Sequence, residues 1–203
     1  MRKVCTTFLM LWAGIAQSEE VVIAALGDSL TQGYGLMQQE GFVPQLETWL
    51  QAKGADVRLI NAGVSGDTSA GGLARVAWTL EPGVDGMIVA LGGNDLLRGL
   101  APKQVRSNIQ GILEVAKTAE VEVLLIGMQA PGNFGPEYKN AFDGIYPELA
   151  QTYQSGYLVS FFGGLMEGEG QGDPAELQQW FQTDGIHPNA EGDARIVQGV
   201  GPS

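Results

Sequence analysis

The sequence of 203 residues has a single cysteine, a single histidine and few basic residues. Cys5, the only cysteine, lies in an N-terminal segment that we expect to be removed. The remaining chain then forms no disulfide and offers no thiolate nucleophile, which excludes a cysteine hydrolase. Eleven Lys and Arg against 23 Asp and Glu give a formal net charge of -12. Such a surface repels phosphate backbones and anionic lipids, so we expect no nucleic acid partner.

Long hydrophobic runs are also missing from the sequence. The apolar run over residues 4–15 has about a dozen residues, whereas a helix needs about 20 to span a bilayer. Basic residues precede this run and the small residues Gly14, Ala16 and Ser18 lie at its end, which is the order of a secretory signal peptide. We therefore expect a signal peptide over residues 1–16, with cleavage after 16 or after 18. The protein should be periplasmic or secreted, without a stable membrane anchor and with a charge of about -14 once two basic residues are removed.

Residues 17–203 predict a single α/β domain, because a chain of this length can bury one continuous core. Stretches with helical spacing, over about 42–50, 73–80 and 105–116, alternate with short apolar runs that are typical of buried parallel strands. The expected strands are Val21 to Leu26, Val57 to Ile60, Met87 to Leu91, Val121 to Ile126 and a fifth near Tyr157 to Phe161. This alternation predicts a three-layer, doubly wound sheet of about five parallel strands with helices on both faces. A short helix is also expected over about 174–181.

The segment Gly27-Asp28-Ser29-Leu30 directly follows the first expected strand. Ligands of open parallel sheets bind at the carboxyl ends of the strands, so Ser29 is well placed to act on one. The simpler interpretation is that Asp28 and Ser29 only cap the following helix. This segment alone does not decide between the two.

His187, the only histidine, lies in Asp184-Gly185-Ile186-His187-Pro188. A serine hydroxyl needs a base of near-neutral pKa to become nucleophilic, and that base needs an acceptor that fixes its tautomer. Asp184, three residues earlier, can be that acceptor. The alternative is a histidine that caps the last helix. His187 is needed as the base, and no cysteine or second histidine remains that could ligate zinc with it. We therefore expect no metal and no cofactor.

Two further polar segments, residues 61–67 and 92–95, come at the ends of the second and third expected strands. Acyl transfer develops an oxyanion, which backbone N–H groups and amide side chains stabilise. Gly66 and Asn94 can supply such donors. Taken singly, both segments could be ordinary turns, since glycine, asparagine and aspartate favour turns.

Taken in order, these four segments resemble the blocks of the SGNH hydrolases, also called the GDSL family, and the likeness extends over about residues 21–195. The resemblance implies a flavodoxin-like fold and a nucleophilic Ser29, with His187 as base and Asp184 as its partner. It also implies that the Ser29 amide, Gly66 and Asn94 form an oxyanion hole. The expected activity is hydrolysis of acyl esters or thioesters through an acyl-enzyme, as a thioesterase, lysophospholipase or arylesterase. We expect a monomer whose partner is a small-molecule substrate.

Three alternatives differ from this reading. An aspartyl phosphatase would need a second carboxylate two residues after Asp28, where Leu30 stands. A non-catalytic binding protein would not need both Ser29 and His187. A carbohydrate O-deacetylase on the same fold would carry stacking aromatics and polar loops. The loops instead carry residues that suit an acyl chain, namely Leu36, Met37, Leu96, Leu97, Leu100, Pro131 and Phe134.

Overall fold

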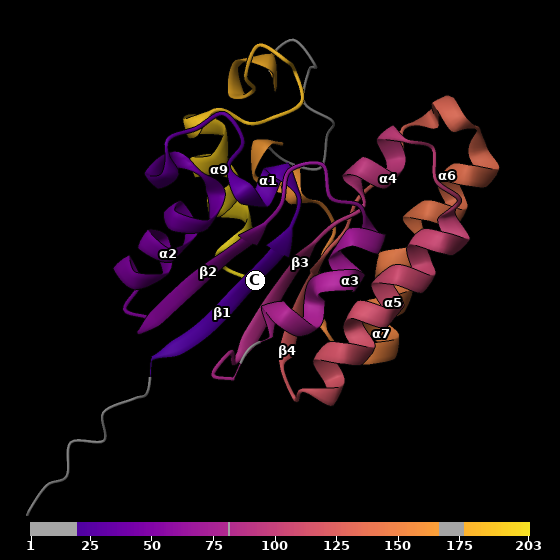
Figure 1. The fold of residues 1–203 in the computed structure, drawn as a ribbon. Helices are drawn as coiled ribbons and strands as arrows, with labels where there is room; N and C mark the ends of the chain where they lie inside the picture. Colours follow the sequence, from indigo (N-terminus) through magenta and orange to yellow (C-terminus); the bar gives the residue numbers. More distant parts are fainter. Residues whose placement is uncertain (1–19, 81, 167–176) are drawn as a thin grey trace, which may run out of the picture.

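The computed structural model describes residues 20–80, 82–166 and 177–203, so the expected signal peptide lies outside the described residues. Five strands form one parallel sheet in the order β2-β1-β3-β4-β5 (Figure 1), which confirms the predicted α/β architecture. The strands are β1 (Val21–Gly27), β2 (Val57–Gly63), β3 (Gly86–Ala90), β4 (Glu122–Ile126) and β5 (Gly156–Leu158). The fifth strand is shorter than predicted, because Ser160 caps a 3-10 turn that begins at Phe161.

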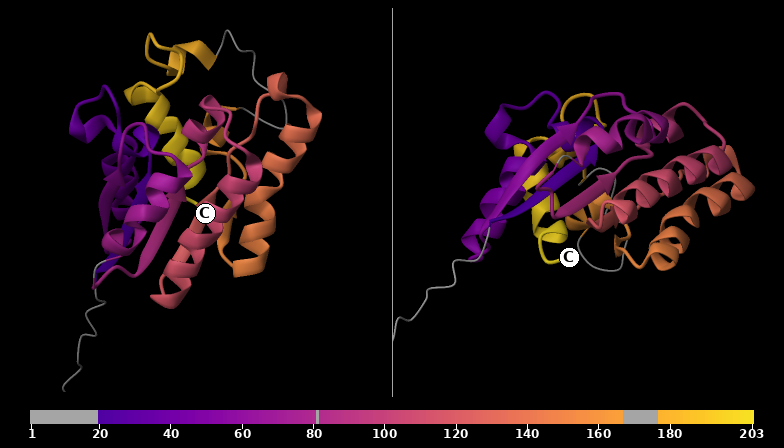
Figure 2. Two further views of the ribbon diagram at one scale, coloured as in Figure 1. Left: turned by 45° about the vertical axis from the view of Figure 1, so that its right-hand side comes forward. Right: turned by 60° about the horizontal axis from the view of Figure 1, so that its bottom comes forward.

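Helices cover both faces of the sheet, so the domain has three layers (Figure 2). The α-helices are α1 (Ser29–Gln32), α2 (Phe42–Ala52), α3 (Ser69–Thr79), α4 (Gly93–Leu97), α5 (Pro102–Thr118), α6 (Pro136–Asp143), α7 (Ile145–Tyr153) and α9 (Ala190–Val200). Short 3-10 helices are η1 (Gln38–Glu40), η2 (Gly132–Phe134), η3 (Phe161–Leu165) and η4 (Gln178–Trp180). Of the helix predicted near 174–181, only the η4 turn and its flanks lie within the described residues.

The core is divided between the two faces of the sheet, and successive strand residues alternate between them. In β3, Met87 and Val89 pack with α3, α5 and α7, whereas Ile88 and Ala90 pack with α2 and α9. A strand that is buried on both faces does not alternate between polar and apolar residues. This burial explains why the central strands are continuous apolar runs.

Arg75 of α3 ties together the strand ends where the polar segments begin. Its guanidinium donates to the carbonyl oxygens of Ala62 at 2.7 Å and Gly27 at 2.9 Å, and its Nε lies 2.7 Å from Asp67 Oδ2. The pair is largely shielded from water, with side chains 23% and 17% exposed. Because Gly27 ends β1 and Ala62 is the next-to-last residue of β2, this arginine holds together the carboxyl ends of the two strands, where the candidate site is built.

Candidate active site

Ser29 is the first residue of α1 and lies where β1 ends. Asp28 caps this short helix, because its Oδ1 accepts from the Leu30 N–H at 3.0 Å. The capping interpretation is therefore correct for Asp28, and the cap leaves the Ser29 hydroxyl free to point elsewhere. A Cβ on Gly27 would overlap Thr31, so only glycine lets α1 turn back this tightly after the strand.

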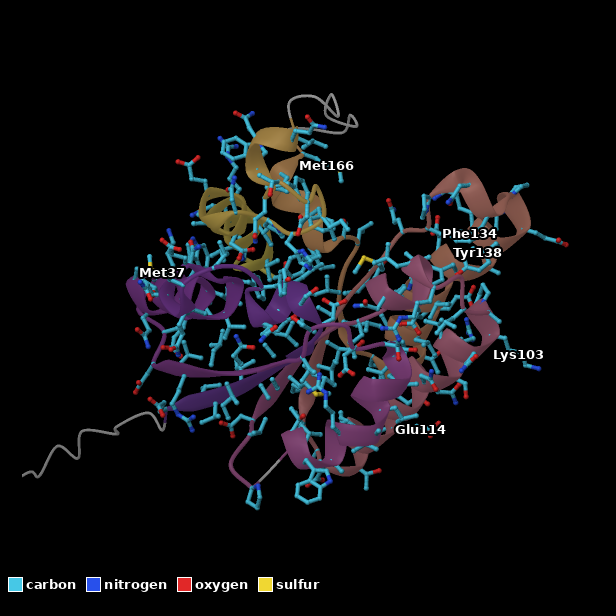
Figure 3. The ribbon with its side chains drawn as sticks, turned by 45° about the horizontal axis from the view of Figure 1, so that its top comes forward. Met37, Lys103, Glu114, Phe134, Tyr138 and Met166 are labelled. Atoms are coloured by element: carbon cyan, nitrogen blue, oxygen red, sulfur yellow. The ribbon has the colours of Figure 1, made fainter. Side chains whose placement is uncertain are left out.

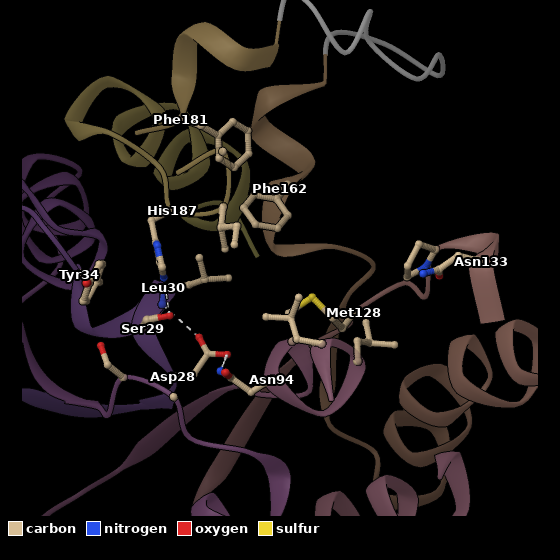
Figure 4. Close-up of a pocket in the computed structure, with 18 of the residues that line it drawn as sticks. Asp28, Ser29, Leu30, Tyr34, Asn94, Met128, Asn133, Phe162, Phe181 and His187 are labelled. Atoms are coloured by element: carbon tan, nitrogen blue, oxygen red, sulfur yellow. Dashed lines mark hydrogen bonds between the residues drawn. The ribbon is translucent and has the colours of Figure 1, made fainter. Parts of the chain in front are cut away.

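His187 reaches Ser29 from a loop near the other end of the chain (Figure 4). Its Nε2 lies 2.9 Å from Ser29 Oγ, and its Nδ1 lies 2.7 Å from Asp184 Oδ2. With Nδ1 donating to the carboxylate, Nε2 carries a lone pair that accepts the serine hydroxyl proton. The structure thus brings together the three residues that the sequence grouped as nucleophile, base and orienting acid.

Asp184 is held in its own turn by three hydrogen bonds. The other carboxylate oxygen, Oδ1, accepts from the backbone N–H groups of Ile186 at 2.9 Å and His187 at 3.0 Å. The hydrogen bond from the His187 ring, followed by these two backbone bonds, lowers the pKa of Asp184 to about 2. The carboxylate is therefore ionised, as an acceptor for Nδ1–H must be. Gly185, with φ of 67°, makes the turn that closes this arrangement.

Asn94, in the first turn of α4, lines the same pocket as Ser29. Its Nδ2 donates to Asp28 Oδ2 at 3.1 Å, which uses one of its two N–H groups and leaves the second for another acceptor. Burial raises the pKa of Asp28, while the Leu30 N–H and the Asn94 amide work in the opposite direction. Asp28 thus orients the Asn94 side chain as well as capping α1.

Gly66 lies on the loop after β2 and lines the same pocket as Asn94 and Ser29. Its φ of 81° is in the left-handed region, and its carbonyl accepts from Arg98 Nη2 at 2.9 Å. A buried link also joins this loop to α4, because Asp95 accepts from the Ser69 N–H at 2.8 Å and from the Ser69 hydroxyl at 2.6 Å. Two contacts, Arg98 with Gly66 and Asp95 with Ser69, therefore hold the Gly66 loop and α4 in place relative to each other.

A pocket of about 850 Å³ opens beside Ser29 and His187, and its lining is mostly apolar. Of the loop residues expected to suit an acyl chain, four line it: Leu96, Leu97, Pro131 and Phe134. Leu36, Met37 and Leu100 do not, so that part of the prediction is wrong. Leu100 packs against the core, and Met37 lies on the opposite side of the molecule from Phe134 (Figure 3).

The sequence did not point to several residues of this pocket. Tyr34 places its ring over His187, with 4.6 Å between the ring centroids. The apolar side chains of Met128, Phe162 and Phe181 also line the pocket, as do Leu30 and Ile186, which lie within the two motifs that contain Ser29 and His187. Phe162 and Phe181 come from turns whose sequences have no periodic pattern, so only the folded chain shows that they converge here.

The described part of the chain holds neither a candidate metal cluster nor a candidate membrane span. Within residues 20–80, 82–166 and 177–203, no group of three or more His, Cys, Asp or Glu side chains could hold a metal ion. In the same part of the chain, no helix has the length and apolar character needed to cross a membrane.

The chain is similar to known proteins over most of its length. The GDSL-like Lipase/Acylhydrolase family matches residues 25–195. The chain is 38% identical to "Esterase TesA" of Pseudomonas aeruginosa over 188 residues, which cover 92% of this chain and 89% of that protein. It is 38% identical to "Thioesterase 1/protease 1/lysophospholipase L1" of Escherichia coli over 186 residues, which cover 91% and 83%. The crystal structure of AlinE4, described as an SGNH-hydrolase family esterase, matches with a TM-score of 0.74 and 42% identity, covering 90% of this chain and 94% of that one.

Proposed function

Because the chain belongs to the GDSL-like lipase/acylhydrolase family and is an ester-hydrolysing serine enzyme, we propose that Ser29, His187 and Asp184 are its catalytic triad. The family that the sequence blocks resembled is thus confirmed. The observation that carries the triad is the continuous hydrogen-bond chain from Ser29 Oγ through both ring nitrogens of His187 to Asp184, beside a pocket of about 850 Å³.

The proposed reaction has two halves that use the same groups. Ser29 Oγ attacks the acyl carbon while its proton moves to His187 Nε2, and the Nδ1–H bond to Asp184 stabilises the imidazolium. The carbonyl oxygen becomes an oxyanion, which accepts from the backbone N–H groups of Ser29 and Gly66 and from the free N–H of Asn94. The bond from the acyl carbon to the leaving group then breaks while the imidazolium protonates the leaving oxygen or sulfur, so that an alcohol or thiol departs and an acyl ester remains on Ser29. Water then attacks the acyl carbon and gives a proton to His187, and His187 passes that proton to Ser29 Oγ as the bond from the acyl carbon to Oγ breaks, which releases the carboxylic acid and restores the serine.

We propose acyl esters and thioesters as the substrate class, including the lysophospholipid and aryl ester substrates implied by the family resemblance. The apolar lining of the pocket supports this, because each buried methylene is worth about 0.8 kcal/mol, about a fourfold change in kcat/KM. A panel of 4-nitrophenyl esters from acetyl to palmitoyl tests it. Rising kcat/KM with chain length is expected, whereas strong preference for acetyl groups and for acetylated xylan would indicate a carbohydrate O-deacetylase.

We propose that the protein acts in the periplasm or outside the cell, which rests on the signal-peptide features over residues 1–16. Mass measurement of the protein recovered from a periplasmic fraction tests both the location and the cleavage position. An uncut chain in the cytoplasm would contradict the proposal.

Replacement of Ser29 by alanine tests the nucleophile. Ser29→Ala should lower kcat by on the order of 10⁶ while the protein stays folded, because the covalent step is lost. Ser65 is a second serine hydroxyl that lines the pocket and therefore serves as the matched control. Ser65→Ala should retain at least a tenth of the activity. The reverse result, or labelling of a folded Ser29→Ala protein by a fluorophosphonate, would refute the assignment.

A further inference from the structure

Ser29 and His187 lie 158 residues apart in sequence, and each is presented by a short, partly exposed segment. Ser29 belongs to α1, which ends at Gly33 and continues into the exposed loop at Tyr34 and Gly35. His187 belongs to a hairpin-like loop over residues 181–188, closed by an antiparallel bridge between Phe181 and Pro188. Hydrogen bonds besides the one between Ser29 Oγ and His187 Nε2 are therefore needed to hold the two segments at a fixed distance.

Gln182 provides such a connection with a single side chain. Its Nε2 donates to the carbonyl oxygen of Tyr34 at 2.7 Å and to that of Pro188 at 2.9 Å. Its backbone N–H donates to the carbonyl oxygen of His187 at 2.8 Å. One side-chain amide thus donates to the Ser29 segment and to the His187 loop at the same time. The backbone N–H of the same residue bonds to His187 itself.

The approach of the two segments at this point is close. A Cβ added to Gly35 would overlap Oε1 of Gln182, so the Tyr34-Gly35 backbone lies directly against the amide. The Tyr34 ring lies over the His187 ring on the same side. We propose that Gln182 is a positioning residue, which sets the distance between Ser29 Oγ and His187 Nε2 by joining the loop that carries each. This inference rests on the proposed roles of Ser29 and His187.

Gln45 makes a chemically similar connection farther from the triad. Its Nε2 donates to the carbonyl oxygens of Glu40 at 2.5 Å and Ala190 at 3.0 Å. It therefore also joins the N-terminal part of the chain to the C-terminal part. Its second acceptor lies at the start of α9, beyond the His187 loop. Gln45 is therefore a matched control for the loss of such a bridge without direct change at His187.

The test uses Gln182→Glu, which keeps the size of the side chain but replaces the two donors by a carboxylate oxygen facing two carbonyl oxygens. Misplacement of a reacting group by about 1 Å costs up to about 100-fold in rate, so kcat should fall about 10- to 100-fold while KM stays within about twofold. Gln45→Glu should leave kcat within about threefold. If Gln182→Glu does not accumulate as folded protein, Gln182→Met removes the same donors without adding charge and serves for the same measurements.

A double-mutant cycle with His187→Ala separates positioning from general damage. The residual rate that the oxyanion donors support on a reactive 4-nitrophenyl ester is the baseline. If Gln182 acts through His187, Gln182→Glu should change this residual rate by less than about twofold. An equal fall of 10-fold or more in both backgrounds, or an equal loss in Gln45→Glu, would overturn the inference. A His187→Ala enzyme as fast as the wild type would instead overturn the proposed function.

Discussion

Replacement of Asp193 by asparagine should make the folded protein more stable at pH 8 and leave its stability at pH 4 nearly unchanged. Asp193 lies in the first turn of α9 and is only 1% exposed. Within the described residues, its Oδ1 has no hydrogen-bond partner. Burial raises the pKa of Asp193 from 3.8 to about 7, although a hydrogen bond from the Phe42 backbone partly opposes the change.

The direction in which the free energy of unfolding changes with pH depends on which state, folded or unfolded, keeps the proton on Asp193. Below about pH 4 the carboxyl is protonated in both the folded and the unfolded chain, so it contributes no pH dependence. Between about pH 4 and pH 7 the unfolded chain releases the proton while folded Asp193 keeps it, so the free energy of unfolding falls as pH rises. The difference between 3.8 and about 7 corresponds to about 4 kcal/mol, reached in full above pH 7. Asparagine does not ionise and should recover this loss.

Urea unfolding of wild type and Asp193→Asn from pH 4 to pH 8, followed by tryptophan fluorescence, measures the effect. Trp49 and Trp180 report on α9 directly, through a hydrogen bond to Gln198 and a ring contact with Arg195. The advantage of the variant should grow with pH and level off above pH 7. Glu191→Gln, which removes an exposed carboxylate from the same helical turn, should change stability by less than about 0.5 kcal/mol at each pH. A difference between wild type and Asp193→Asn that does not vary with pH would refute the reasoning.

Four predictions concern the reaction. Asn94→Ala should lower kcat by about 10² to 10³ with little change in KM, because in the proposed mechanism its second N–H donates to the oxyanion; a raised KM with unchanged kcat would contradict this. Since the pKa of Asp184 is about 2, that carboxylate stays ionised above about pH 3, so protonation of Asp184 should not contribute to any fall of kcat/KM measured at pH 4 and above. Asp184→Asn should cost several orders of magnitude in kcat, and a variant as fast as wild type would refute its role. Activity measured after dialysis against EDTA should be unchanged, because His187 is the only histidine and Cys5 the only cysteine; loss restored by zinc would refute this.

The sequence predicted the sheet and the position of the site because both depend on local patterns. Buried parallel strands are apolar on both faces, so β1 and β3 could be located to within about one residue. Ser29 and Asn94 follow strand ends, and the ends of parallel strands meet at one edge. That these residues lie together was therefore predictable, whereas their roles stay predictions for the experiments above.

What the sequence did not predict depends on contacts between distant loops. Tyr34 and Gln182 have no local pattern that marks them, because their importance arises only where the two loops meet. The mistaken expectation for Leu36 and Leu100 has the same origin. Hydrophobicity indicates that a loop residue will be covered, but not whether the pocket or the core covers it, and Leu100 was covered by the core.

The separation of 158 residues between Ser29 and His187 also sets the order in which activity can appear during synthesis. A chain that has grown as far as α7 already contains Ser29 and the proposed oxyanion donors, but it lacks His187, the proposed base, and α9, which packs against α2. On the proposed mechanism, the growing polypeptide is therefore an inactive precursor until the residues after α7 have emerged and docked. Activity should therefore report only on chains that contain both Ser29 and His187.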